Sequence, residues 1–177
     1  MNYANIKNLS IENGPGIRVS LFVSGCRWHC EGCFNSVAWD FDYGQKFTSR
    51  TLLELLRLIG SPHIAGFSVL GGEPLEPENR DEVCDICSTV KLEYPKKNVW
   101  IWTGYNFEVV KYLPVMKYVD VLVDGRFEVD KKDLSLPYCG SSNQRVIDVP
   151  KSLESGEVVL WKDPHIVKNS DIRRREL

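Results

Sequence analysis

Four short hydrophobic runs constrain the fold of this chain more than any other feature of its sequence. Each is rich in β-branched and aromatic side chains, the composition of a buried strand: RVSLFVSG (18–25), GFSVLGG (66–72), NVWIWTGY (98–105) and KYVDVLVDG (117–125). Between them, residues 47–62 and 77–95 place apolar side chains at helical spacing, and residues 106–113 predict a shorter helix. Strands that alternate with helices predict a single α/β domain, built as an incomplete TIM-like barrel or as an open, mostly parallel sheet with helices.

The ends of these runs are expected to share one rim, because parallel α/β folds bind ligands at the carboxyl ends of their strands. The first run ends at a cysteine loop (SGCRWHCEGCFN, 24–35) and the second at a glycine loop (GGEP, 71–74). The third and fourth end at TGY and DGRF. If the strands are parallel, the cysteine loop and the glycine loop face one another.

Size and composition limit the class of protein. The 177 residues fit one domain, with 1–147 as its main part and 148–177 as a C-terminal extension whose charged tail is partly frayed. Within the extension and just before it, strand-like pieces are expected around Val159 and Val146. The net charge of −2 gives no reason to expect nucleic acid or an anionic membrane as a partner.

The start of the chain does not read as a signal peptide, and no apolar stretch approaches the roughly 20 residues of a membrane helix. We therefore expect a cytoplasmic protein. In such a reducing compartment, the six cysteines are more often metal ligands, catalytic groups or buried side chains than disulfides.

Three cysteines of the cysteine loop, Cys26, Cys30 and Cys33, have the spacing C-x3-C-x2-C. Thiolates hold iron–sulfur clusters, and a four-iron cluster with three thiolate ligands keeps one iron open to a small molecule. Gly25 and Gly32 allow the backbone to approach a bulky cluster. A zinc site that uses His29 or a distant ligand is the alternative, although the usual second pair of cysteines is missing from this loop.

Six segments carry a resemblance to a known family. In order from Asn13 to Arg145 they are NGPGIRVSLFVSGC, GCFN, LGGEPL, IWTGYNFE, VLVDGRF and GSSNQR. The chain thereby resembles the radical S-adenosylmethionine superfamily and, within it, the family of anaerobic ribonucleoside-triphosphate reductase activating proteins. The resemblance implies an enzyme that reductively cleaves S-adenosylmethionine at a 4Fe-4S cluster and generates a glycyl radical on the anaerobic reductase.

The resemblance also implies roles for individual residues. Cys26, Cys30 and Cys33 would hold the cluster, and Gly32 and Phe34 would lie near the adenine of S-adenosylmethionine. The wall beside the methionine amino group would be formed by Gly71, Gly72 and Glu73; for the Glu73 side chain, orientation of the turn is an equal alternative. No side chain is assigned as a catalytic acid or base, because the cluster and S-adenosylmethionine carry the chemistry.

The expected partners are the glycyl radical subunit of the reductase and an external one-electron donor such as a flavodoxin or ferredoxin. Two alternatives remain open: a small radical enzyme that acts on a small molecule, as modified-nucleobase synthases do, and a non-catalytic zinc or electron-transfer protein.

Other chemistry-bearing residues have simpler expectations. Cys84 and Cys87 lie on a predicted helix and are interpreted as small buried side chains, with Cys139 as a residue that could join them. Trp100 and Trp102 are expected to pack on one face of a strand. Asp124 is either a site residue at a strand end or a turn-forming aspartate.

Overall fold

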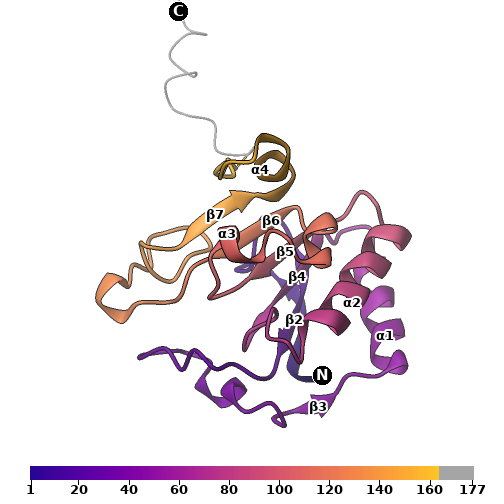
Figure 1. Cartoon of the computed structure of the whole chain (residues 1–177). Coiled ribbons are helices and arrows are strands. Elements are labelled where there is room, and N and C mark those ends of the chain that lie inside the picture. The colour runs from indigo at the N-terminus through magenta and orange to yellow at the C-terminus, as the bar shows by residue number, and fades with distance from the viewer. Residues whose placement is uncertain (164–177) are drawn as a thin grey trace, which may run out of the picture.

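The computed structural model describes residues 1–163, which form one seven-stranded sheet with helices packed against it (Figure 1). The strand order is β3-β1-β2-β4-β5-β6-β7. The strands are β1 (Asn2–Ser10), β2 (Arg18–Val23), β3 (Gln45–Lys46), β4 (Gly66–Gly71), β5 (Asn98–Trp102), β6 (Val121–Asp124) and β7 (Arg145–Asp148). The helices are α1 (Ser49–Ile59), α2 (Arg80–Glu93), α3 (Phe107–Val110) and α4 (Val149–Ser155), with short 3-10 turns η1 (Ser36–Trp39), η2 (Pro114–Lys117) and η3 (Val129–Lys131).

The sheet is open, with parallel strands at its centre and antiparallel pairs toward both edges. The four central strands, β2, β4, β5 and β6, are mutually parallel. β1 and β3 pair antiparallel on one side, and β7 pairs antiparallel with β6 on the other. The predicted α/β class is confirmed: the sheet is mostly parallel and does not close into a barrel. The four predicted strands are the four parallel ones.

Two strands escaped the sequence analysis. β1 is mostly exposed or half-buried, and β3 has only two residues, both exposed. Polar strands near a sheet edge lack the hydrophobic run on which the prediction depended.

The predicted long helices form where capping and apolar spacing place them. Thr48 accepts a hydrogen bond from the Thr51 amide in a capping box, and α1 ends at Gly60. α2 buries Val83, Ile86, Cys87 and Val90. Both helices pack on the same face of the sheet, around the large hydrophobic core (Figure 1).

The opposite face of the sheet carries a smaller aromatic cluster. Along β5, Val99 and Ile101 point into the large core, whereas Trp100 and Trp102 point to this second face, as the two-residue period of a strand requires. The packing role expected for these tryptophans is confirmed. Trp161 folds back from beyond α4 and packs edge-on against Trp100, with ring centroids 4.9 Å apart.

The expected pieces around Val146 and Val159 are also observed. The first is β7, and the second pairs with it through an Ile147–Leu160 bridge. The charged tail expected at 173–175 lies outside the described residues. None of the helices in residues 1–163 has the length and apolar character needed to cross a membrane.

A buried arginine explains the NGPGIR segment. Arg18 donates hydrogen bonds to Ser68 Oγ at 2.7 Å, Asn98 Oδ1 at 2.6 Å and the Phe67 carbonyl at 2.8 Å. Its guanidinium lies 5.5 Å from the centre of the Trp100 ring. Burial lowers the pKa of Arg18 to about 10, so the group remains a cation at neutral pH. It joins β2, β4 and β5 at their amino ends.

Candidate functional site

The cysteine loop and the glycine loop meet at the carboxyl ends of β2 and β4, as predicted. The amide of Glu73 donates to the Gly25 carbonyl at 2.8 Å, and the amide of Gly72 donates to the Val23 carbonyl at 2.8 Å. A Cβ on Gly72 would lie 2.6 Å from the Gly25 carbonyl oxygen, so only glycine allows this approach. Two loops that are distant in sequence therefore touch through their backbones.

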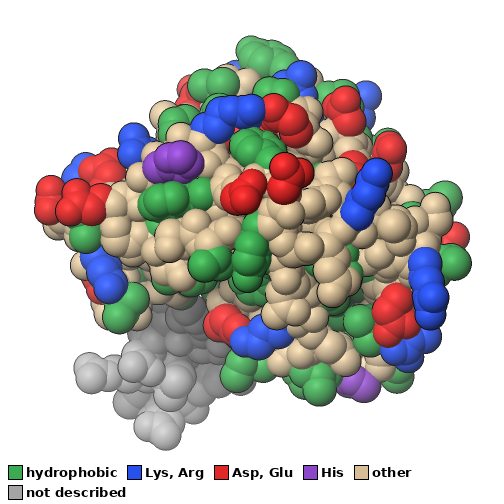
Figure 2. Space-filling model, turned by 90° about the horizontal axis from the view of Figure 1, so that it is seen from below, with side chains coloured by type: hydrophobic (Ala, Val, Ile, Leu, Met, Phe, Trp, Pro, Cys, Tyr) green, Lys and Arg blue, Asp and Glu red, His purple; other side chains and the backbone are tan. Residues whose placement is uncertain are grey.

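This rim faces downward in Figure 1. The carboxyl end of β2 lies beside the N-terminus, because the Ser24 amide bonds to the Asn2 carbonyl at 3.0 Å, and the N-terminus and β3 are at the bottom of the view. Figure 2 looks onto the molecule from this side. Apolar side chains are interspersed with acidic and basic ones, and neither charge covers the face.

The three cysteines of the cysteine loop differ in exposure. Cys26 is buried, with 8% of its surface exposed, whereas Cys30 and Cys33 are half-buried. Burial raises the pKa of the Cys26 thiol to about 11, so a bound cation is needed to keep it as the thiolate that binds metals. Backbone bonds anchor this end of the loop, since Gly25 and Cys26 donate to the carbonyls of Ala38 and Trp39.

Three free thiols in one loop are the kind of ligand that an iron–sulfur cluster needs. Their side chains do not converge in this structure, so their assignment as cluster ligands stays a prediction. All six cysteines are free. Within residues 1–163, no three His, Cys, Asp or Glu side chains converge as a ready metal-ion site.

A second sign of an incomplete site is the location of unpartnered polar atoms. In the described part of the chain, three buried side-chain atoms lack a hydrogen-bond partner: Ser24 Oγ, Asn35 Nδ2 and Asn143 Oδ1. Buried polar groups without partners are rare and call for an explanation. Ser24 and Asn35 are the two ends of the cysteine loop, and Asn143 contacts the Arg126 carbonyl of the DGRF loop through its amide nitrogen. The shortage of partners is thus concentrated at this rim.

Gly32 and Phe34 lie on the open side of the cysteine loop. Gly32 adopts a left-handed conformation with φ of 71°, and a Cβ there would lie 3.2 Å from Val129 Cγ2. Phe34 is 89% exposed, so its ring is accessible to a ligand. The contacts expected of both residues with an adenine remain predictions.

The Glu73 side chain is buried and bonds to several loops at once. Only 1% of its surface is exposed, and its carboxylate accepts four hydrogen bonds. The donors are Trp28 Nε1 at 2.9 Å, the Leu75 amide at 2.9 Å, Thr103 Oγ1 at 2.7 Å and the Gly104 amide at 2.7 Å. Burial raises the pKa of Glu73 to about 7, against the lowering effect of these hydrogen bonds. The geometry favours the turn-orienting alternative for this side chain.

The third and fourth loops join the same rim. Thr103 and Gly104 of the TGY loop bond to Glu73, and Arg126 of the DGRF loop donates to the Trp28 carbonyl at 3.0 Å. The predicted gathering of all four loops is confirmed.

Asp124 has a structural role in this arrangement. It is buried and accepts hydrogen bonds from the Phe107 amide at 2.7 Å and from Arg145 Nε at 2.9 Å. Its partners lie on α3 and β7 rather than in its own turn, so the site alternative stays a prediction.

Sequence reasoning missed the side chains that hold the cysteine loop. Arg27 bonds to Glu76 and Glu78, and Arg126 reaches Trp28. The sequence did show charged residues next to the cysteine motif. Their partners are distant in sequence, so the spacing of residues could not identify the pairs.

The remaining cysteines do not gather. Cys87 is buried in the large core, with Cys84 packed beside it, whereas Cys139 packs against the aromatic cluster on the other face. Burial raises the pKa of Cys87 far above its usual value, which marks an inert thiol.

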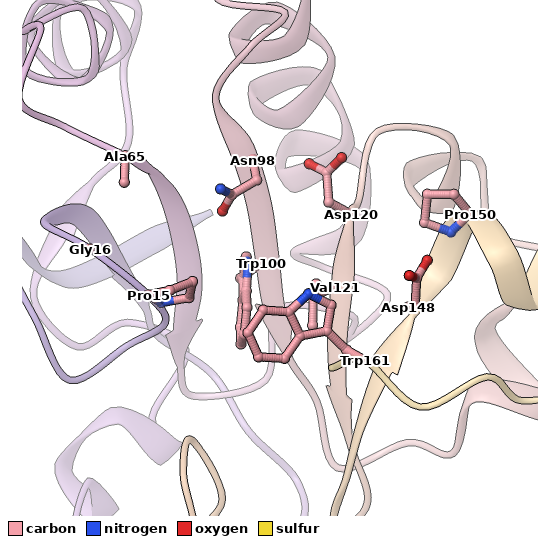
Figure 3. Close-up of a pocket in the computed structure, with 10 residues that line it drawn as sticks. All are labelled: Pro15, Gly16, Ala65, Asn98, Trp100, Asp120, Val121, Asp148, Pro150 and Trp161. Atoms are coloured by element: carbon pink, nitrogen blue, oxygen red, sulfur yellow. The ribbon is translucent and has the colours of Figure 1, made fainter. Parts of the chain in front are cut away.

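A pocket of about 360 Å³ lies far from these loops, at the amino ends of the parallel strands (Figure 3). Trp100, Trp161, Asp120 and Asp148 surround it. Its carboxylates are already paired: Asp120 with Lys91 at 2.8 Å and Asp148 with Lys151 at 2.6 Å. Its lining side chains, all within residues 1–163, include none of the unpartnered buried atoms. The chemistry therefore points to the opposite rim.

Comparison with known proteins agrees with this site. Residues 12–147 match the family described as "4Fe-4S single cluster domain". The chain therefore belongs to a class of iron–sulfur proteins with one four-iron cluster.

Named relatives narrow the class. The anaerobic ribonucleoside-triphosphate reductase-activating protein of Enterobacteria phage T4 is 45% identical over 146 residues, which cover 82% of this chain and 93% of the relative. The protein of the same name from Escherichia coli (strain K12) is 39% identical over 150 residues, covering 82% and 97%. That of Pasteurella multocida (strain Pm70) is 39% identical over 150 residues, covering 81% and 95%. The chain belongs to the anaerobic ribonucleoside-triphosphate reductase-activating protein family, which confirms the resemblance read from its six segments.

Proposed function

We propose that this protein is a radical S-adenosylmethionine activating enzyme that generates a glycyl radical on an anaerobic ribonucleoside-triphosphate reductase. The observation that carries the proposal is the backbone contact between the cysteine loop and the glycine loop, the 2.8 Å bond from the Glu73 amide to the Gly25 carbonyl. This contact puts a three-thiol loop and a glycine-lined wall side by side at one rim. Family membership adds the cluster type and the reaction.

Residues of this rim have distinct tasks in the proposal. Cys26, Cys30 and Cys33 would hold a 4Fe-4S cluster, which, when bound, supplies the electron that splits the sulfonium of S-adenosylmethionine. Gly71, Gly72 and the backbone of Glu73 would line the methionine end, and Gly32 and Phe34 the adenine end. The chain's own contribution is to bind, orient and exclude water, as is usual for cofactor enzymes.

The partner must reach this rim. A hydrogen atom is taken from a glycine of the reductase, so the rim must admit a polypeptide loop. The mixed surface of Figure 2 is suited to a protein partner, because protein interfaces combine apolar and charged groups. We assign residues 1–147 to the activase domain and 148–177 to its extension.

The electron comes from outside the chain in this proposal, from a one-electron donor such as a flavodoxin or ferredoxin. We place the enzyme in the cytoplasm, where a reducing milieu keeps thiols such as its six free cysteines reduced.

Anaerobic reconstitution with iron and sulfide tests the function. The reduced protein should cleave S-adenosylmethionine to methionine and 5′-deoxyadenosine. Addition of the reductase should produce a glycyl radical detectable by electron paramagnetic resonance. A colourless protein that holds zinc alone would instead support the non-catalytic alternative. Cleavage without any radical on the reductase would support a small-molecule substrate.

A further inference from the structure

The two residues that follow the first cysteine, Arg27 and Trp28, are both held by acidic side chains on the other loop. The Arg27 amide donates to Glu76 Oε1 at 2.9 Å, and its Nη1 donates to Glu76 Oε2 at 2.9 Å. Trp28 Nε1 donates to Glu73 Oε2 at 2.9 Å. Glu73 ends the GGE sequence and Glu76 follows three residues later. The segment between Cys26 and Cys30 is thus hydrogen-bonded to the other loop at two adjacent residues.

The two carboxylates that bond to this segment are buried. Glu73 and Glu76 have only 1% and 2% of their surface exposed. Hydrogen bonds to ionised groups are stronger than those between neutral groups, and the low dielectric of a buried site strengthens them further. By contrast, the bond of Arg27 to Glu78 lies at the surface, with 49% of the Glu78 side chain exposed.

The Glu73 carboxylate has no capacity left for a ligand. A carboxylate offers about four lone-pair positions, and Trp28, Leu75, Thr103 and Gly104 occupy four. An incoming ammonium group would have to displace one of these donors. The neighbouring ring supports the fixed geometry, since Trp28 packs edge-on against Tyr105 with centroids 4.8 Å apart.

We propose that Glu73 and Glu76 form a carboxylate clasp on Trp28 and Arg27 that holds the cysteine loop in register with the glycine loop. The proposal rests on the function proposed above. It makes all four residues positioning residues, and it assigns the Glu73 side chain to the protein scaffold rather than to S-adenosylmethionine. Displacements of about 1 Å reduce rates by up to about 100-fold in well-oriented sites. The clasp therefore sets the rate of S-adenosylmethionine cleavage through the relative position of the two loops.

Two variants remove the clasp from opposite sides. Trp28→Phe deletes the indole N–H and keeps an aromatic ring against Tyr105. Glu76→Ala deletes the acceptor of the Arg27 amide. Glu78→Ala is the matched control, because it removes a surface partner of the same arginine, and exposed ion pairs contribute little.

Hydrogen exchange on the anaerobic, cluster-loaded protein is the primary readout, because it does not depend on turnover. Both clasp variants should exchange the amides of residues 26–30 about 10-fold faster than wild type. Their iron content should stay at the wild-type level, and kcat/KM for S-adenosylmethionine cleavage should fall about 10- to 100-fold. Glu78→Ala should match wild type in exchange and rate.

Wild-type exchange and wild-type kcat/KM in Trp28→Phe would overturn the clasp. So would a defect confined to Glu73→Gln and expressed as a raised KM alone, because that pattern marks direct contact with S-adenosylmethionine. Failure of the wild-type protein to cleave S-adenosylmethionine would reject the proposed function, whereas the exchange data would still decide the clasp.

Discussion

Gly72 lies so close to Gly25 that a Cβ on Gly72 would be 2.6 Å from the Gly25 carbonyl oxygen and 2.9 Å from that of Ala38. Both neighbours are backbone atoms, which cannot rotate away. The glycine loop and the cysteine loop therefore hold each other at a separation that depends on a missing side chain.

Gly72→Ala is expected to force the two loops apart. Overpacking of this kind destabilises by about 1–3 kcal/mol, and cleavage of S-adenosylmethionine should fall by up to about 100-fold because the loops no longer align. Urea unfolding and the anaerobic cleavage assay measure the two effects. Gly156→Ala is the control for activity: nothing lies within 4 Å of its Cβ, and although its φ of +78° makes alanine destabilising there, cleavage should stay at the wild-type level. Equal activity in both variants would contradict the close-approach argument.

Replacement of Cys26, Cys30 or Cys33 by alanine should each abolish cluster assembly, because a four-iron cluster needs every available thiolate. Iron and sulfide content after anaerobic reconstitution, together with the visible absorbance, is the measurement. Cys84→Ala and Cys139→Ala should retain full iron content, since these cysteines pack in two separate clusters. Retention of iron by any single variant of the first three would show that this cysteine is not a ligand.

Arg18→Met should destabilise the fold by about 3 kcal/mol, because it leaves the buried Ser68 Oγ and the half-buried Asn98 Oδ1 without their donor. Urea unfolding of the variant measures the loss. Arg18→Lys should restore only part of it, since an ammonium cannot reproduce the planar fork of the guanidinium. Wild-type stability in Arg18→Met would mean that the arginine is tolerated rather than required.

Trp161→Ala should lower the free energy of unfolding by about 2 kcal/mol through loss of apolar burial and of its edge-on contact with Trp100. Iron content and S-adenosylmethionine cleavage should be unchanged, because the aromatic cluster lies away from the cysteine loop. Trp161→Phe, which keeps a ring, should lose less. A drop in iron content without a drop in stability would contradict this separation.

The sequence by itself determined the parallel centre of the fold and the identity of the functional loops. Hydrophobic runs such as residues 66–72 and the helical spacing within residues 77–95 are local signals, set by burial on both faces of a strand or on one face of a helix. The C-x3-C-x2-C spacing and the glycine loop are equally local, so the chemistry could be read before the fold was known.

Only the tertiary structure decided the antiparallel edges of the sheet and the partners to which the charged side chains bond. β1 has no hydrophobic run that would mark it in the sequence. It is held in the sheet by backbone pairing with its neighbours rather than by burial of its side chains. Glu73 could be read from sequence either as a ligand contact or as a turn-orienting residue, and its four donors come from three different loops. Long-range hydrogen bonds of this kind leave no periodic trace in the chain, since they depend on which strand ends the sheet brings together.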